Sequence, residues 1–382
     1  MGVLGCSSPS NRAGGSTEAE SVDSADSGVS GPSASAALPA PFTDLVDTAE
    51  RWRWITTGDD LIDVWVCHVP LDTEATIYRG MTLRLPLTPK NVTDMVRQSV
   101  PQYYETISHG QYRPVFRPGG EVQMGSEDGP NDCIAEATER AAADAQGLLL
   151  VADAEHGSSD PGGFGLVGSD CTVDFCAVAA TGRALYVGAS DFHPDWGDLK
   201  PMDLVEHELG HLLGWGHSSV DGSTYLSALD VMSNSAAPRD VDPDRRDASD
   251  TLALNRVFAG WLPEGDVWAA PTGGGTVVLA RSTGPSGTRL AVLPVDGNVF
   301  VTVELLVAEG YNDHLPADGV AVHRVAVSDG RPDDVVALVG EPPYDELLQP
   351  GAKFDVEGWR IEVARVAGAG QALQWTVRIT RE

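Results

Sequence analysis

The chain has 382 residues, of which 42% are hydrophobic and 21% charged, enough for two domains with ordinary cores. Its formal net charge of −31 excludes nucleic acid and anionic membrane surfaces as expected partners, because like charges repel. It contains no run of about 18 apolar residues, so no transmembrane helix is expected.

The N-terminal residues Val3-Leu4-Gly5-Cys6 resemble a bacterial lipobox, after which the cysteine carries a lipid. Only five residues precede Cys6, so the charged and apolar regions of a signal peptide are missing; the alternative is a cysteine without function in a disordered tail. Residues 7–41 are rich in Ser, Ala, Gly and Pro and predict a flexible tether. We therefore expect an extracellular or cell-surface lipoprotein of a bacterium, with a lipid on Cys6 as its membrane attachment.

Between Phe42 and Gly260 the expected helices and strands alternate. Apolar and β-branched runs predict buried strands, and Pro118-Gly119-Gly120 between two short runs predicts a hairpin. Periodic or alanine-rich stretches predict helices, one of them kinked at Pro101. The expected strands are Leu61–Cys67, Tyr112–Phe116, Glu121–Met124, Leu148–Val151 and Ala184–Gly188, and the expected helices are Pro89–His109, Cys133–Gln146 and Ser249–Phe258.

Four cysteines, Cys67, Cys133, Cys171 and Cys176, lie in this part of the chain. An even number in an exported domain predicts two disulfides. A bridge between Cys171 and Cys176 is the simplest local pairing and leaves Cys67 with Cys133, although the other two connectivities remain open.

Three of the nine histidines fall within the eleven residues from His207 to His217, which read H-E-x-x-H-x-x-G-x-x-H. On a helix that begins near Met202, His207 and His211 lie one turn apart on the same face, where two imidazoles can bind one zinc ion. Gly214 permits the left-handed backbone that ends such a helix, so His217 can return as a third ligand. Three protein ligands leave a position open for water, which is typical of a catalytic zinc site.

Glu208 follows the first of these histidines and faces a slightly different side of the helix. There it can accept a proton from a zinc-bound water without becoming a ligand, which is the role of a general base. Gly210 within a helix costs about 1 kcal/mol relative to alanine and needs a reason such as close backbone packing. The alternative is an accidental match, which does not explain Glu and Gly at the positions that the chemistry requires.

From Pro263 onward short β runs are separated by Gly, Pro and Asp, which predicts an antiparallel β-sandwich. His314 and His323 are isolated in this part and are expected to be ordinary surface or core residues. The expected strands are Thr276–Ala280, Leu290–Val295, Val299–Leu305, Gly319–Val325, Arg360–Val366 and Gln374–Ile379.

The stretch from His207 to His217 resembles the signature of metzincin metalloproteases. Metzincins also have a Met-turn, whose methionine lies beneath the metal, and Leu229–Ser233 with Met232 fits that element. Residues 225–233 and 255–262 (NRVFAGWL) resemble bacterial relatives of gametolysin and of the immune inhibitor A peptidases. Astacin-like and serralysin-like metzincins place a metal-binding tyrosine two residues after the methionine, where this chain has Asn234, so no tyrosine ligand is expected.

The resemblance implies an α+β fold. We expect three parts. Residues 1–41 form the lipobox-like start and tether, and residues 42–262 form a metzincin-like catalytic domain with a mixed sheet and helices. Residues 263–382 form the β-sandwich. It also implies an edge strand, upstream of the zinc helix, that binds substrate as an added strand. One catalytic zinc ion is the expected cofactor; the acidic surplus also permits calcium, for which no ligands are assigned.

Two functions of different classes are compatible with these features. The first is an extracellular zinc endopeptidase that hydrolyses proteins or peptides, with Glu208 as general base. The second is a cell-surface binding or adhesion lipoprotein whose zinc site is vestigial or structural. Glu208 favours the enzyme, because a structural zinc site has no use for a carboxylate at that position.

Overall fold

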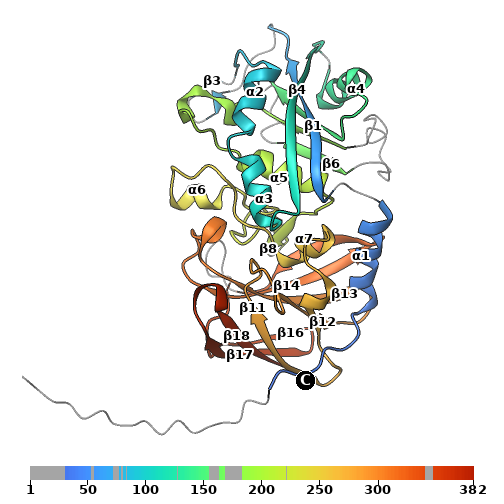
Figure 1. Ribbon diagram of the computed structural model, residues 1–382, viewed down its shortest axis with the longest axis vertical. Helices are drawn as coiled ribbons and strands as arrows, with labels where there is room; N and C mark the ends of the chain where they lie inside the picture. The colour runs from blue at the N-terminus through green and yellow to red at the C-terminus, as the bar shows by residue number, and fades with distance from the viewer. Residues whose placement is uncertain are drawn as a thin grey trace, which may run out of the picture. The chain divides into compact units, whose positions relative to one another are not determined.

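The computed structural model describes residues 31–52, 56–71, 77–78, 81–82, 84–126, 128–154, 163–167, 183–220, 222–339 and 347–382. Within it, Pro32–Glu382 form one compact unit, whose elements are labelled in Figure 1. The lipobox-like residues with Cys6, most of the expected tether, and Cys171 and Cys176 lie outside the described residues. None of the described helices is both long and apolar enough to cross a membrane.

A mixed five-stranded sheet contains the strands expected before the histidine motif. Four of its strands are parallel and the fifth, β6, is antiparallel and lies at one edge. In spatial order the strands are β4 (Tyr112–Gln123), β1 (Gly58–His68), β5 (Gly147–Ala152), β7 (Arg183–Val187) and β6 (Gly163–Val167). All residues of β5 and β7 are buried, as is typical of parallel strands covered on both faces.

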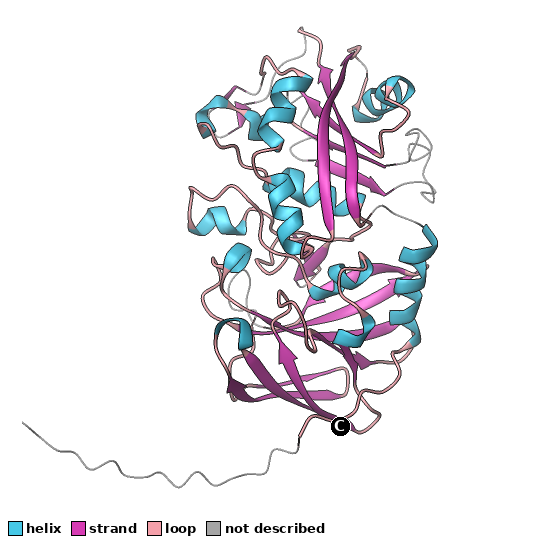
Figure 2. Cartoon of the chain, viewed as in Figure 1, coloured by secondary structure: helices cyan, strands magenta, loops and turns pink. Residues whose placement is uncertain are grey.

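Helices cover both faces of this sheet (Figure 2). One face packs against α2 (Pro89–Val96), α3 (Val100–Ile107) and α5 (Asp203–Leu212), whose apolar side chains share a core with Val64, Leu149 and Leu185 of the strands. The other face packs against α4 (Pro130–Arg140) through Cys133, Ile134 and Ala137.

The expected hairpin around Pro118-Gly119-Gly120 is wrong, because β4 runs through it as one strand parallel to β1. The register shifts there by a bulge opposite Trp65. A Cβ atom on Gly119 or on Gly120 would lie 2.5 Å from an atom of the Trp65 ring. The two glycines therefore allow the Trp65 ring to pack closely on the backbone of β4, and they do not form a turn. Proline is tolerated because β4 is an edge strand.

The expected helices also differ in their bounds. The stretch Pro89–His109 forms two helices. Pro101 lies in the first turn of α3, where a backbone N–H would have no acceptor within the helix, so its absence costs no hydrogen bond. The stretch Cys133–Gln146 is helical only to Arg140, because Gln146 instead exchanges hydrogen bonds with Leu61 at the start of the sheet. The helix expected at Ser249–Phe258 is shorter and corresponds to α7 (Ala253–Phe258).

A helix that the sequence did not predict, α1 (Ala40–Trp52), begins at the end of the expected tether. Phe42 on this helix packs edge-on against Phe300, with ring centroids 5.6 Å apart. The residues before it are also held, since Ser33 N–H donates to the Thr276 carbonyl and Ala36 N–H to the Ala269 carbonyl, at 2.8 and 2.9 Å. The C-terminal end of the expected tether is therefore part of the compact unit.

Two further sheets share a second apolar core, built around Val303, Trp359 and Val377. Every strand expected after Pro263 is present. The smaller sheet is antiparallel, with the order β11 (Gly274–Ala280), β18 (Gln374–Arg381), β17 (Trp359–Ala367) and β16 (Lys353–Val356). The larger sheet has the order β10 (Val267–Ala269), β12 (Leu290–Pro294), β13 (Val299–Leu306), β14 (Gly319–Ser328), β15 (Arg331–Ala337), β8 (Ser218–Val220) and β9 (Ser223–Thr224).

The larger sheet is mixed rather than antiparallel, because β10 pairs with β12 and β8 pairs with β15 in parallel. Strand β8 directly follows His217, so the third histidine of the motif is joined to a sheet made mainly of residues beyond 263. One apolar core also extends across this position and contains Trp261, Leu262 and Leu290. The other described elements are a short ladder of β2 (Ile77–Tyr78) with β3 (Met81–Thr82), the helix α6 (Ala237–Val241) and short 3₁₀ helices at Ser190–Phe192, Pro194–Trp196, Glu264–Asp266, Gly310–Asn312 and Gly370–Ala372.

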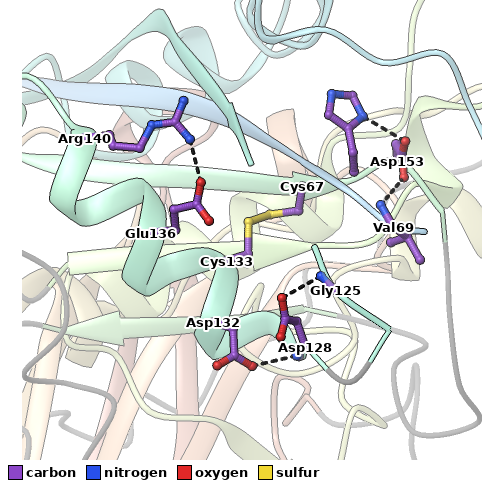
Figure 3. Close-up of a disulfide and its surroundings, with 11 residues drawn as sticks. Cys67, Val69, Gly125, Asp128, Asp132, Cys133, Glu136, Arg140 and Asp153 are labelled. Carbon is purple, nitrogen blue, oxygen red and sulfur yellow. Dashed lines mark hydrogen bonds and ion pairs between the residues drawn. A yellow bond between two sulfur atoms is a disulfide. The ribbon is translucent and has the colours of Figure 1, made fainter. Parts of the chain in front are cut away.

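The expected disulfide between Cys67 and Cys133 is confirmed. It joins the end of β1 to α4, with Cα atoms 6.1 Å apart and both residues fully buried (Figure 3). Nearby, Glu136 and Arg140 form an ion pair on the exposed side of α4 (Figure 3). The disulfide therefore holds α4 to the centre of the sheet.

Replacing both cysteines, Cys67→Ala with Cys133→Ala, should lower the free energy of unfolding by about 4 kcal/mol, because the bridge closes a long loop in the unfolded chain. The midpoint of urea unfolding measures the loss. Reduction of the unchanged protein should shift the midpoint by a similar amount, and an unchanged midpoint in the double variant would contradict the bridge.

Candidate metal centre

The helix α5 carries the first two histidines of the motif and is buried along most of its length. Two acidic residues, Asp203 and Glu206, lie in its first turn, where negative charge interacts favourably with the positive end of the helix dipole. At its C-terminal end, Trp215 N–H donates to the Gly210 carbonyl and Gly214 N–H to the His211 carbonyl, at 3.1 and 2.9 Å. Together with a φ of +87° at Gly214, these bonds form a Schellman motif, as expected for the glycine of the motif.

The chain turn after Gly214 brings the three histidines together. The Nε2 atom of His217 lies 3.1 Å from Nε2 of His211 and 3.2 Å from Nε2 of His207. His207 is buried and the other two are partly exposed. The three side chains form a group that could hold a metal ion, as the sequence predicted.

The hydrogen bonds of the Nδ1 atoms determine which protonation state the Nε2 atoms of two of these rings have. His207 Nδ1 lies 2.6 Å from the Val231 carbonyl, and His211 Nδ1 lies 2.8 Å from the Trp215 carbonyl. A carbonyl oxygen only accepts, so both Nδ1 atoms carry the proton and both Nε2 atoms present lone pairs. These two lone pairs and His217 form a group that could bind a cation. Nitrogen ligands of tetrahedral zinc lie about 3.3–3.4 Å apart, so the group fits this ion.

Burial lowers the pKa of all three histidines, to about 3 for His207 and about 4 for His211. Repulsion between protonated imidazoles lowers the pKa of His207 and His211 further. The neutral imidazoles that a metal requires are therefore already the stable form at neutral pH.

Met232 is fully buried and packs against Gly210 of α5. It explains the glycine inside α5, because a Cβ atom on Gly210 would overlap the Met232 sulfur and come within 2.9 Å of the Trp215 ring. The preceding residue, Val231, supplies the carbonyl that orients His207. The turn thus supports the helix by contact and the first histidine by a hydrogen bond.

Asp230 is a residue of the site whose role the sequence did not reveal. Its buried carboxylate accepts hydrogen bonds from Ser218 Oγ at 2.7 Å, Thr251 Oγ1 at 3.2 Å and Asn255 Nδ2 at 3.3 Å. Burial raises the pKa of Asp230 to about 6, although these donors oppose the rise. Since Ser218 directly follows His217, the carboxylate ties the third histidine to the turn that contains Met232.

Glu208 is 3% exposed, and its Oε2 atom has no hydrogen-bond donor among the described residues. Burial raises the pKa of Glu208 to about 8. A buried carboxylate without a donor costs free energy, so its presence beside His207 points to a functional rather than a structural role.

Tyr225 is the second residue that sequence reasoning missed. It lies just after β9, with a φ of +67° that is uncommon for a residue other than glycine. Its hydroxyl is 3.2 Å from His217 Nε2, and its ring centroid is 5.1 Å from that of His217 and 5.9 Å from that of His207. The side chain is about half exposed. No spacing rule connects Tyr225 with the histidines, because the hairpin of β8 and β9 brings it back.

Other residues considered from the sequence lie outside the cluster. The Asn234 amide donates to the Asp240 carboxylate at 3.4 Å. His314 lies 2.8 Å from the Ala228 carbonyl, and His323 is fully buried in the larger sheet. Among the described residues, no second group of three His, Cys, Asp or Glu brings its ligand atoms together, so calcium has no assigned site there.

No known protein family matches the chain, and no curated protein shows significant sequence similarity to it.

The purified protein, freed of metal and titrated with zinc, should bind one ion tightly per chain, as equilibrium dialysis with elemental analysis would show. His217→Ala should lower this affinity strongly, because two imidazoles remain of three. His323→Ala is the control and should leave it unchanged, since His323 lies outside the cluster. Full affinity in the His217→Ala variant would remove this residue from the ligand set.

Proposed function

We propose that the chain is a zinc endopeptidase of the metzincin type. The observation that carries the proposal is the convergence of three histidine Nε2 atoms, those of His207 and His211 unprotonated, next to a buried carboxyl group whose Oε2 atom has no donor among the described residues. Met232 packs against the same helix at Gly210. The mixed sheet with helices on both faces supports a metzincin-like catalytic domain, and the two sheets with a shared core support a β-sandwich after it.

His207, His211 and His217 would hold the zinc ion. When bound, zinc supplies a Lewis acid that polarises the scissile carbonyl and acidifies water. Glu208 takes the proton of the attacking water and passes it to the amine of the leaving group. Burial suits this exchange, because a carboxyl whose pKa lies near neutrality can both accept and release a proton.

Tyr225 would donate its hydroxyl proton in a hydrogen bond to the oxygen of the scissile carbonyl as negative charge develops there. Its position beside His217 and its partial exposure place the hydroxyl where a substrate can reach it. Donors aimed at a developing oxyanion are a large source of catalysis. The unusual backbone at Tyr225 supports this role, because such strain is maintained mainly at functional sites.

A substrate would bind in extended form along β6. This strand is the edge of the five-stranded sheet and contacts α5, the helix of the first two histidines. Within the described residues no strand pairs with its outer side. An edge strand offers free N–H and C=O groups to a peptide of any sequence, as an endopeptidase requires. The disulfide between Cys67 and Cys133 supports an extracellular or cell-surface location.

Glu208→Gln should lower the hydrolysis of an unfolded protein such as casein by about 10²–10⁴-fold, because glutamine cannot accept a proton at neutral pH. Zinc content and thermal stability should stay close to those of the unchanged protein. The control Glu139→Gln, at an exposed position of α4 on the opposite face of the sheet from α5, should keep full activity.

This comparison also tests the alternative of a binding lipoprotein with a structural zinc site. That function predicts no hydrolysis by either protein. Equal hydrolysis by both, at equal zinc content, would exclude Glu208 as the base.

Tyr225→Phe removes one hydroxyl and should lower kcat by about 10²-fold with little change in KM, since the hydrogen bond forms mainly in the transition state. Zinc affinity should be unchanged, which separates this role from that of a ligand. An unchanged kcat, or a parallel loss of zinc, would contradict the assignment.

A further inference from the structure

The helix α1 comes before the five-stranded sheet in the chain, but it packs on the larger sheet, where it contacts β13, β14 and β15 (Figure 1). Its residues Phe42 and Leu45 are buried in the apolar core that also contains Val335 of β15. The first elements of the compact unit therefore cover strands that the chain forms near its other end.

The extended residues before α1 are anchored to the same body. Ser33 Oγ accepts a hydrogen bond from the Thr276 N–H at 3.0 Å, and Ser35 Oγ accepts one from the Ala269 N–H at 2.9 Å. A Cβ atom on Gly275 would lie 2.8 Å from the Ser33 side chain, so this glycine makes room for the segment. Residues 32–52 together form a strap, called the N-terminal strap below.

The turn between β14 and β15 is shaped to receive this strap. Gly330 in the turn has a φ of +72°, and a Cβ atom there would overlap the Thr48 hydroxyl and lie 3.1 Å from the Asp44 carbonyl oxygen. Thr48 is buried between α1 and the turn, with 2% of its surface exposed. A side chain at Gly330 would therefore push α1 away from the start of β15.

The strand β15 also contacts the histidine motif. A Cβ atom on Gly216 would lie 3.2 Å from the Pro332 carbonyl oxygen, and Ser218 pairs with Val335. These two contacts lie on either side of His217 in the chain, and His217 is the member of the histidine group that does not lie on α5. Its position is thus set by β15, which the N-terminal strap holds.

We propose that the N-terminal strap is a built-in effector of the histidine centre, such that docking of the strap and binding of a metal ion favour each other. When the strap leaves the larger sheet, Val335 and the turn at Gly330 lose their packing, and His217 loses its fixed position. A bound ion has the opposite effect, because it fixes His217 and, through β8, also β15. Linkage requires both effects to be equal in size. The inference rests on metal binding by the proposed centre, not on peptidase activity.

Gly330→Ala in the full chain tests the first direction, and Gly297→Ala is the matched control. Both glycines lie in turns between paired strands, with φ of +72° and +75°, but nothing lies within 4 Å of a Cβ atom on Gly297. The backbone strain of the two changes is therefore similar, and only Gly330→Ala displaces the strap. It should weaken zinc binding about tenfold, as equilibrium dialysis measures, whereas the control should leave the affinity unchanged.

Hydrogen exchange of the unchanged protein tests the reverse direction and needs no substitution that affects folding. Zinc should slow amide exchange in α1 about tenfold, because local opening of the strap becomes costlier. Exchange in α4 should not change, since α4 packs on the face of the five-stranded sheet away from α5. In the His217→Ala variant zinc should no longer slow exchange in α1.

Equal zinc affinity of the Gly330→Ala and Gly297→Ala variants overturns the proposal, and so does exchange in α1 that zinc slows no more than exchange in α4. Both results leave the proposed metal centre intact. A protein that binds no zinc at all overturns the metal centre and this inference together.

Discussion

Two backbone carbonyl groups, those of Val231 and Trp215, determine the chemistry of the histidine cluster. Each accepts the Nδ1 proton of one imidazole, so each Nε2 atom turns an unshared electron pair toward the same point. Without these bonds the two rings could rotate or take the other tautomer. The geometry of the histidine group therefore depends on where the main chain places two oxygen atoms, and the surrounding structure holds these atoms in position.

One of these carbonyls belongs to the helix end and the other to the turn beneath it. Trp215 follows the glycine that ends α5, and its buried ring packs on Trp261 with centroids 5.4 Å apart. Val231 is held between Asp230, which collects three side-chain donors, and Met232, which packs under Gly210. Both carbonyls are thus positioned by buried contacts that reach far along the chain, which gives the cluster a rigid frame.

The pairing of β8 with β15 extends this frame into the larger sheet. It anchors the residues just after His217 to a strand more than a hundred residues later. The shared apolar core around Trp261 and Leu290 adds to the same connection. The β-rich C-terminal part therefore contributes to the geometry of the histidine centre. A histidine group held in this way needs no flexible closure to bring its third member into place.

The sequence by itself predicted the helix, the spacing of His207 and His211 on it and the left-handed glycine that ends it, because these are local properties. It thereby also predicted that three histidines form a group that could hold a metal ion. Apolar and β-branched runs in the sequence also predicted most strands, including β5, β7 and β13. Of the two expected disulfides, one lies within the described residues and is present. Only the tertiary structure decided that Pro118-Gly119-Gly120 lies at a bulge within one strand, since the ring of Trp65 comes from another strand. It likewise decided that Tyr225 lies beside His217 and that Asp230 accepts hydrogen bonds from three side chains. Each of these depends on contacts between distant segments, which no periodicity or spacing within the sequence expresses.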